Sequence, residues 1–388
     1  MTKKERIDAA LTGKIPDRVP FVPKIWIDLA ANLAGVDLVQ TIQDPLAVLR
    51  VIVNVGLDLG IDAVRQFHFP VRSIAIESGI AYDVRPDGSK RGTVDIQGGL
   101  HTRLSDADEF ELEDPHYAAF HHYYDADSPF VNSLDEARSI HVPAKTYYEE
   151  IGCGDRQRQI LGEVGDRLPF FGDCSSATLA FYVCMRKMDR ALMDLLQEPE
   201  LVHAVMEKGV AIAVEKGKFN IDLGLKILRL NDSVGNMSVI SPHHWREFIF
   251  PHMKDACDEL HAYDPEVKIY CHICGNVLPI LDDLILTGLD CIAPLDPLGK
   301  FTCAQAREAA GENAALMGGI NTLSFLESKP ADIKEEAKRC MREAGMNGAF
   351  ILGSGCVIPR NAKRESLVAV MEAVRQYGVY YGGVLADD

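Results

Sequence analysis

Residues 267–295 read VKIYCHICGNVLPILDDLILTGLDCIAPL and contain, in order, an apolar strand, a helix and a second apolar strand. We predict the strands over residues 267–273 and 289–293 and the helix over residues 277–286. Short apolar runs of this length are typical of strands that are buried on both faces. A strand, a helix and a strand joined this closely form a right-handed crossover between parallel strands. The stretch therefore predicts a parallel sheet covered by helices.

The same alternation extends to both sides of this stretch. Further strands are predicted over residues 168–171, 226–230, 314–320 and 349–353, and further helices over residues 199–219, 243–263, 331–344 and 364–377. An α/β fold of this kind is either a closed barrel or an open, doubly wound sheet. The open sheet would require a Gly-rich phosphate loop after an early strand, and the sequence has none. We therefore predict a (β/α)8 TIM barrel.

The first third of the chain is less regular. Its expected elements are an extended piece at residues 18–22, a helix at 45–60 and a hairpin at 74–103 with Pro86-Asp87-Gly88 as its turn. Residues 106–144 are acidic and aromatic and show little periodicity. We expect a single barrel domain over residues 1–388 with an N-terminal extension. An inserted loop region at about residues 80–165 is expected to cover the barrel mouth.

Composition narrows the classes of partner and the compartment. The 388 residues include 57 acidic and 40 basic side chains, for a net charge of −17, which repels phosphate backbones and anionic lipid. We therefore expect neither nucleic acid nor membrane as a partner, and no apolar run reaches the ~20 residues that cross a bilayer. The charged N-terminus, MTKKERIDAALTG, is typical of a helix rather than of a secretion signal. In the expected cytoplasmic setting, the ten cysteines are mostly buried thiols.

The ends of two predicted strands carry a metal-ligand pattern. His272 and Cys274 are two residues apart where the 267–273 strand ends, so their side chains point to the same side. Cys356 follows the last predicted strand at the equivalent position. The carboxyl ends of barrel strands meet at one rim, where the active sites of this fold are built. One imidazole and two thiolates are a zinc set with an open fourth position, as in catalytic sites.

Each of these three residues alone is better explained as part of the core, and only their combination at strand ends favours zinc. Cys271 faces the opposite side of its strand and is interpreted as structural. Cys291, three residues before Pro294, is a rival ligand.

Three motifs carry a resemblance to a known family. They are His272-Ile273-Cys274-Gly275-Asn276, the late Gly355-Cys356-x-x-Pro359 and the opening Pro16-Asp17-Arg18-Val19-Pro20. With these motifs the chain, from about residue 3 to 380, resembles the uroporphyrinogen decarboxylase superfamily, and more closely its zinc-dependent methyltransferase branch. That branch includes methylcobamide:coenzyme M methyltransferases and corrinoid-linked enzymes that demethylate methoxylated aromatics. The Arg-rich N-terminal motif of the decarboxylases is absent from residues 21–28, FVPKIWID, so porphyrin decarboxylation is not expected.

The resemblance implies a TIM-type barrel with zinc at His272, Cys274 and Cys356, and a corrinoid carried by a separate protein that binds transiently. The main hypothesis is that a methyl group moves between a small methylated substrate and the corrinoid cobalt, by O-demethylation of a methoxylated aromatic. The alternative is a methylcobamide:thiol methyl- or alkyltransferase of the coenzyme M type, and a further alternative is a decarboxylase-like lyase. The direction of transfer and the formation of a homodimer stay open.

Polar residues at other strand ends complete the expected site. Asp173, Asn231 and Asp232 are predicted to act in catalysis or to orient the substrate, and the alternative for the aspartates is a helix cap or a turn. The predicted substrate-binding residues are Trp26, Phe171, Tyr148 and Asn321. Three histidines in the irregular stretch are interpreted as lid or surface residues rather than as a second metal site: His116, His121 and His122.

Overall fold

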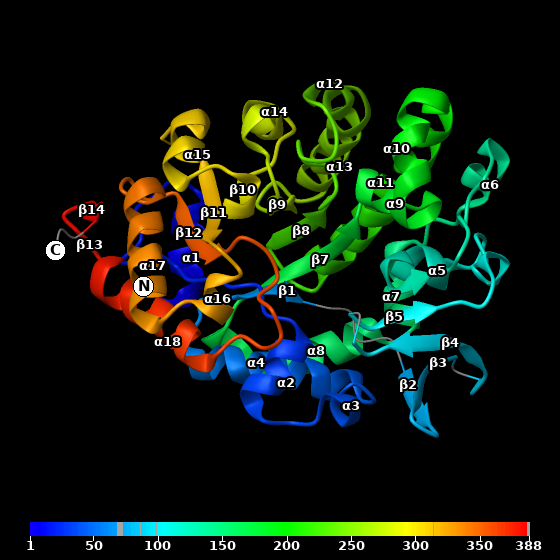
Figure 1. Ribbon diagram of the computed structural model, residues 1–388, viewed down its shortest axis with the longest axis horizontal. Helices are drawn as coiled ribbons and strands as arrows, with labels where there is room; N and C mark the ends of the chain where they lie inside the picture. The colour runs from blue at the N-terminus through cyan, green and yellow to red at the C-terminus, as the bar shows by residue number, and fades with distance from the viewer. Residues whose placement is uncertain (68–72, 86, 98, 313, 386–388) are drawn as a thin grey trace.

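A parallel sheet forms the centre of the protein in a computed structural model that describes residues 1–67, 73–85, 87–97, 99–312 and 314–385 (Figure 1). Its seven strands are ordered β1-β7-β8-β9-β10-β11-β12, and neighbouring strands are parallel. They are β1 (Val64–Phe67), β7 (Phe170–Ser176), β8 (Ile227–Asn231), β9 (Lys268–His272), β10 (Cys291–Leu295), β11 (Ala315–Ile320) and β12 (Phe350–Ser354). The alternation of strands and helices predicted from residue 168 onward is therefore confirmed.

The extended segment that contains Pro20, Phe21 and Val22 lies between β12 and β1, the two edge strands of this sheet. Leu352 of β12 accepts a backbone hydrogen bond from Val22 at 2.8 Å and donates one to Pro20 at 2.9 Å. On the other side, Asp62, just before β1, donates to the carbonyl of Phe21 at 2.9 Å. The described residues thus supply seven regular strands of the eight expected, and this segment bridges the remaining gap. Pro20 has no N–H to donate, which limits regular pairing here.

Helices cover the outside of the parallel sheet (Figure 1). α1 (Lys3–Leu11) begins at a capping box formed by Thr2 and Glu5, and its apolar side chains belong to the core inside the barrel. The helices outside the insertion are α2 (Ile27–Ala34), α3 (Leu38–Thr41), α4 (Pro45–Leu59), α9 (Leu179–Arg186), α10 (Met188–Gln197), α11 (Pro199–Asp222), α12 (Pro242–His244), α13 (Phe250–Tyr263), α14 (Leu281–Leu286), α15 (Cys303–Ala310), α16 (Ser324–Glu327), α17 (Pro330–Ala344) and α18 (Arg364–Tyr377). Among the described helices, none is long and apolar enough to cross a membrane.

The segment of the chain that follows β1 and precedes β7 forms a second sheet, on the right of Figure 1. Its strands are β2 (Ser73–Glu77), β3 (Ile80–Val84), β4 (Lys90–Asp95), β5 (His101–Arg103) and β6 (Tyr124–Asp125). Where one hairpin was predicted, the structure has a meander from β2 to β5, because Ser78 and Gly79 both adopt positive φ (51° and 81°) and add a tight turn. Pro86 of the predicted turn lies outside the described residues.

The stretch predicted as an irregular loop, residues 106–144, also contains short helices. They are α5 (Pro115–Phe120) and α6 (Leu134–Ser139), and α7 (Lys145–Glu150) and α8 (Cys153–Val164) follow before β7. Asp114 and Ser133 accept backbone hydrogen bonds at the starts of α5 and α6. These helices are too short to show a period in the sequence, and their caps were the available signal.

Two layers of inward-facing side chains stand one above the other inside the barrel. Val22, Ala63, Phe171, Ile227 and Tyr270 belong to one interior cluster, which we call the apolar layer. Because side chains alternate along a strand, the residue two positions further on faces the same interior. Those residues are Lys24, Arg65, Asp173, Arg229 and His272, all buried, and we call them the polar layer.

Candidate metal centre

Three side chains that the sequence predicted as metal ligands come together at the carboxyl ends of the strands. His272 ends β9, Cys274 follows two residues later, and Cys356 stands two residues beyond the end of β12. One ligand atom from each lies within 4.8 Å of the other two. The Sγ of Cys356 is 3.7 Å from Nε2 of His272. Tetrahedral zinc, with bonds of ~2.0 Å to nitrogen and ~2.3 Å to sulfur, would separate two such ligands by about 3.6 Å. The donor set and its spacing therefore fit a zinc ion.

Two glycines shape the loops that carry the cysteines. Gly275 has a φ of +93°, and a Cβ there would lie 2.8 Å from the side chain of Asn236. A Cβ on Gly355 would lie 2.9 Å from Oδ1 of Asp296. The other oxygen of Asp296 accepts a hydrogen bond from Gly275 N at 2.9 Å. Asp296 thus bonds the loop of Cys274 and packs closely against the loop of Cys356, and neither glycine tolerates a side chain without movement.

Two of the three side chains, Cys356 and His272, already have the protonation that metal binding requires. A hydrogen bond between the two cysteine side chains is the first cause that lowers the pKa of Cys356 to about 6 and raises the pKa of Cys274. Burial, followed by the charge of Lys24, lowers the pKa of His272 well below its ordinary value. A neutral imidazole and a thiolate are the forms that bind metal ions.

Lys24 lies beside this centre, although it was not predicted as a site residue. Its Nζ is 3.4 Å from Nε2 of His272, and its backbone N donates to Ser354 Oγ at 3.1 Å. Ser354 Oγ in turn donates to the carbonyl of Cys356 at 2.6 Å. Burial is the first cause that lowers the pKa of Lys24 well below its ordinary value, and the charge of Arg229 is the second. Lys24 therefore belongs to the immediate surroundings of the metal centre.

Two buried arginines of the polar layer were also missed. Arg229 donates to Asp173 Oδ1 at 2.6 Å and to Asn231 Oδ1 at 2.7 Å. Arg65 donates to the carbonyl of Ser354 at 2.9 Å. The available signal in the sequence was an Arg two residues after an apolar strand residue, which faces the same interior. This signal indicates a site only when the arrangement of the strands is known.

The three residues predicted to act in catalysis separate into two groups. Asp173 and Asn231 both bond Arg229, and Asn231 also donates to Ser176 Oγ at 3.2 Å, so both lie in or just above the polar layer. Asp232 is fully buried, and its Oδ1 accepts a hydrogen bond from Ala180 N at 2.7 Å in the first turn of α9. Burial raises the pKa of Asp232 to about 6. This carboxyl serves as a tertiary cap of α9 and does not join the ligand cluster.

The four predicted substrate-binding residues also lie in different places. Trp26 lines an apolar cavity beside the barrel mouth. Phe171 belongs to the apolar layer below the polar groups, and Tyr148 is fully buried against Phe219. Asn321 Oδ1 accepts from Leu323 N at 3.0 Å and thus forms a turn after β11. Phe171 and Tyr148 are thus buried in the core, and Asn321 is a partly exposed turn residue.

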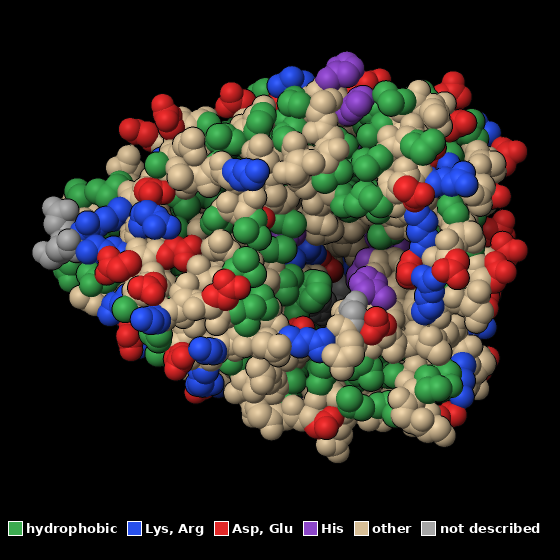
Figure 2. Space-filling model, in the orientation of Figure 1, with side chains coloured by type: hydrophobic (Ala, Val, Ile, Leu, Met, Phe, Trp, Pro, Cys, Tyr) green, Lys and Arg blue, Asp and Glu red, His purple; other side chains and the backbone are tan. Residues whose placement is uncertain are grey.

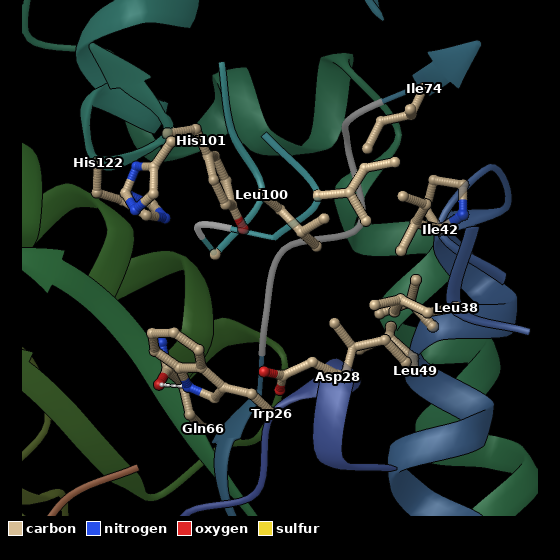
Figure 3. Close-up of a pocket in the computed structure, with 16 residues that line it drawn as sticks. Trp26, Asp28, Leu38, Ile42, Leu49, Gln66, Ile74, Leu100, His101 and His122 are labelled. Carbon is tan, nitrogen blue, oxygen red and sulfur yellow. Dashed lines mark hydrogen bonds between the residues drawn. The ribbon is translucent and has the colours of Figure 1, made fainter. Parts of the chain in front are cut away.

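The cavity beside Trp26 has a volume of about 170 Å³ and opens to solvent. Apolar side chains of α2 to α4 form one wall, and residues of the second sheet and its loops form the other (Figure 3). Trp26 Nε1 donates to Gln66 Oε1 at 3.3 Å, and Lys24 Nζ is 5.3 Å from the centre of the Trp26 ring. Because Lys24 also reaches His272, the cavity adjoins the metal centre.

The other predicted residues take structural positions. Cys271 is buried, as expected, and the rival ligand Cys291 lies in the same interior cluster as Tyr270, apart from the ligand cluster. His121 was interpreted as lid or surface, but it is fully buried and its Nδ1 bonds the carbonyl of Ala118 at 2.9 Å. His122 lines the cavity, and His116 contacts Arg91.

Comparison with known proteins adds a family and a fold. Residues 127–377 match the family described as Uroporphyrinogen decarboxylase (URO-D). A methyltransferase from Methanosarcina mazei has a similar solved structure, with a TM-score of 0.69, 18% identity, and coverage of 97% of this chain and 99% of that chain. This likeness supports the barrel fold.

Curated relatives are similar over part of their length. A methylated-thiol–coenzyme M methyltransferase of Methanosarcina mazei is 26% identical over 46% of this chain and 46% of its own. A uroporphyrinogen decarboxylase of Thermosynechococcus vestitus is 24% identical over 55% of this chain and 61% of its own. A methylcobamide:CoM methyltransferase of Methanosarcina barkeri is 24% identical over 47% of this chain and 51% of its own. The matches thus span less than two thirds of each relative.

Proposed function

We propose, from the premise that this chain belongs to the uroporphyrinogen decarboxylase (URO-D) family, that it is a zinc-dependent methyltransferase. It moves a methyl group between a corrinoid carried by another protein and a small thiol. The observation that carries this proposal is the meeting of His272, Cys274 and Cys356 at the carboxyl ends of the barrel strands. Similar relatives named for methyl transfer to coenzyme M support the thiol as partner.

In this proposal, His272, Cys274 and Cys356 hold one zinc ion. Bound zinc would supply a Lewis acid that lowers the pKa of a thiol, so that the thiolate forms at neutral pH. The chain's own residues arrange the surroundings. Asp296 accepts a hydrogen bond from Gly275 N beside Cys274, and Ser354 links the carbonyl of Cys356 to the backbone of Lys24. These contacts hold the ligands in one geometry before the metal or the substrate binds.

A protein-bound corrinoid has to approach the centre from the barrel mouth. Cys274 and Cys356 are only partly buried, whereas the five residues of the polar layer are buried. Figure 2 shows one face of the molecule with a hollow near its middle, in which basic side chains are visible. We propose a transient contact at the mouth, because a carrier of methyl groups must leave after each transfer.

A second candidate function is demethylation of a methoxylated aromatic. The apolar cavity beside Trp26 favours it, because apolar and aromatic walls are typical of sites for small aromatic ligands. In this case the metal centre would receive the ether oxygen of the substrate instead of a thiol. The cavity adjoins the centre through Lys24, so a ring held there would lie near the ligands.

Elemental analysis and a methyl-transfer assay test the first proposal. We expect one zinc per chain, methyl transfer from methylcobalamin to 2-mercaptoethanol, and loss of the transfer after treatment with a chelator. A protein that transfers the methyl group equally well without metal would contradict the proposal. Loss of the Co(I) absorption band with a methoxybenzoate, and no reaction with thiols, would favour the second candidate instead.

A further inference from the structure

Two histidines face each other between neighbouring helices on the outside of the barrel, where α11 and α13 lie side by side (Figure 1). Nδ1 of His203, in α11, is 3.0 Å from Nε2 of His252, in α13. His252 is 6% exposed, and the ring of His203 packs on Phe248 with ring centres 5.1 Å apart. Phe248 belongs to a π-helical turn directly before α13, and such turns are frequent at functional sites. Packing from three segments therefore holds the two rings together.

A groove of about 320 Å³ runs between the two helices beside this pair. Its charged lining residues are all acidic: Glu207 from α11, and Asp255, Asp258 and Glu259 from α13. Asp258 pairs with Lys254 at 2.8 Å. Within the part of the chain that the structure describes, the carboxylates of Glu207 and Asp255 make neither a hydrogen bond nor a salt bridge. Two carboxylates of the groove are thus uncommitted.

Helix geometry places these two carboxylates on the side of the histidines. Glu207 is four residues after His203, and Asp255 is three residues after His252, so each shares a helix face with its histidine. α11 and α13 run in the same direction, as successive crossover helices on a parallel sheet do. Both carboxylates therefore lie one turn further along the same groove.

We propose that His203 and His252 bind a divalent transition-metal ion such as Zn²⁺, with Glu207 and Asp255 completing its ligands. The site is separate from the candidate metal centre at the barrel mouth and does not depend on the proposed methyl transfer. A bound ion would join α11 to α13. Since it binds only the folded chain, it would also stabilise the fold.

The distance between the rings suits such an ion. Two nitrogens bound to one ion at about 2.1 Å are roughly 3.0 to 3.4 Å apart, and His203 and His252 are already at 3.0 Å. The ring that donates the hydrogen bond between them takes its other tautomer when the ion binds. Burial lowers the pKa of His252 to about 4, so this ring is neutral near pH 7, as metal binding requires.

The remaining ligands have to come from side chains that move. Among the described residues, three ligand atoms within 4.8 Å of one another occur only at the barrel mouth, so the groove offers two preformed ligands. Glu207 and Asp255 are exposed and can rotate toward the histidines. Imidazole nitrogens with carboxylate oxygens are a set that zinc, cobalt and nickel accept.

Cobalt(II) serves as the probe for this site, with the full chain first treated with one equivalent of zinc to fill the cysteine centre. We expect calorimetric titration to show one further equivalent of Co²⁺ per chain. Its absorption spectrum should lack the thiolate-to-cobalt charge-transfer band, because no cysteine lies among the proposed ligands.

Variants separate binding at this site from folding and from other surface histidines. His203→Gln should lose the cobalt equivalent. Glu207→Gln combined with Asp255→Asn changes exposed side chains alone and should weaken cobalt binding more than about tenfold. The matched control is His243→Gln, because His243 is exposed and lies 3.4 Å from Glu247 but makes no hydrogen bond to another histidine in the described chain. This control should bind cobalt as the wild type does.

Loss of the cobalt equivalent in His203→Gln, together with its retention in His243→Gln, supports the site. A zinc-treated wild type that takes up no cobalt overturns it. A thiolate charge-transfer band on the added cobalt also overturns it, because the ion is then held by cysteines. Unchanged affinity in His203→Gln or in the double carboxylate variant has the same consequence.

Discussion

The apolar layer and the polar layer lie two residues apart on the same five segments of the barrel, yet they have opposite effects on stability. Burying Phe171 or Tyr270 removes apolar surface from water and stabilises the fold. Burying Arg229 or Lys24 removes charge from water, which costs free energy unless a partner compensates. The comparison teaches that a curled parallel sheet can be packed as a core at one level and hold a candidate metal site at the next.

The largest effect is expected from a ligand of the metal centre. Cys356→Ala should abolish stoichiometric zinc and lower methyl transfer more than about a hundredfold, because even a lost partner of a metal ligand costs 10- to 100-fold. Zinc by elemental analysis and the transfer rate measure it. Cys291→Ala, in the interior cluster with Tyr270, is the matched control and should keep its zinc. Equal zinc loss in both variants would contradict the assignment of Cys356, rather than Cys291, as a metal ligand.

A substitution in the apolar layer should act on stability instead. Phe171→Ala removes a fully buried aromatic side chain, so the free energy of unfolding should fall by about 3–5 kcal/mol. Denaturant unfolding of the metal-free protein measures it, and zinc content should not change. A variant of unchanged stability that has lost its zinc would contradict the assignment of Phe171 to the core.

The polar layer should show its cost when one partner of its ion pair is removed. Asp173→Ala leaves Arg229 buried beside Lys24 without its carboxylate, and it should destabilise the protein by about 3 kcal/mol. In Asp173→Ala with Arg229→Met the lone charge is gone, so most of the stability should return. Denaturant unfolding of the two variants compares them. If the double variant is the less stable one, the pair contributes net stability and the contrast with the apolar layer weakens.

A buried histidine outside the barrel should affect stability only in acid, and not at neutral pH. Burial lowers the pKa of His121 to about 4 from an ordinary value of 6.5. The unfolded chain therefore binds the proton first, and stability falls by up to roughly 3 kcal/mol as the pH drops from 6.5 to 4. In His121→Gln this part of the acid loss should disappear, so the unfolding free energy of the variant should fall less steeply between pH 6.5 and pH 4 than that of the wild type. Parallel pH profiles would contradict a role for His121.

Local patterns in the sequence were sufficient for much of the fold. Apolar runs and helical periods located the strands from β7 onward, since each element depends on residues that are neighbours in the chain. The same two-residue alternation put His272 and Cys274 on one side of β9. The turn at Ser78 and Gly79 was missed, although a Ser-Gly pair between two apolar runs is itself a turn signal in the sequence.

Site residues were harder to predict where contacts with a distant segment decide the role of a side chain. Asp232 follows β8 as a rim residue should, yet its carboxyl caps α9 because that helix starts against it. Phe171 and Asp173 are two residues apart on the same face of β7. Phe171 lies in the apolar layer and Asp173 pairs with Arg229, and this difference depends on which side chains of the neighbouring strands lie at the same height. The sequence gives the face of a strand but not the height at which its neighbours end.

The sequence by itself determined the alternation of strands and helices and the facing of His272 with Cys274, because both depend on short-range periodicity. Only the tertiary structure decided that Cys356, 84 residues away, comes within 3.7 Å of His272, and that Lys24 bonds Ser354, 330 residues away. It also gathered Arg65 and Arg229 beneath them. These meetings depend on how the strands are staggered when the sheet curls, and hydrogen bonds between distant segments fix that stagger.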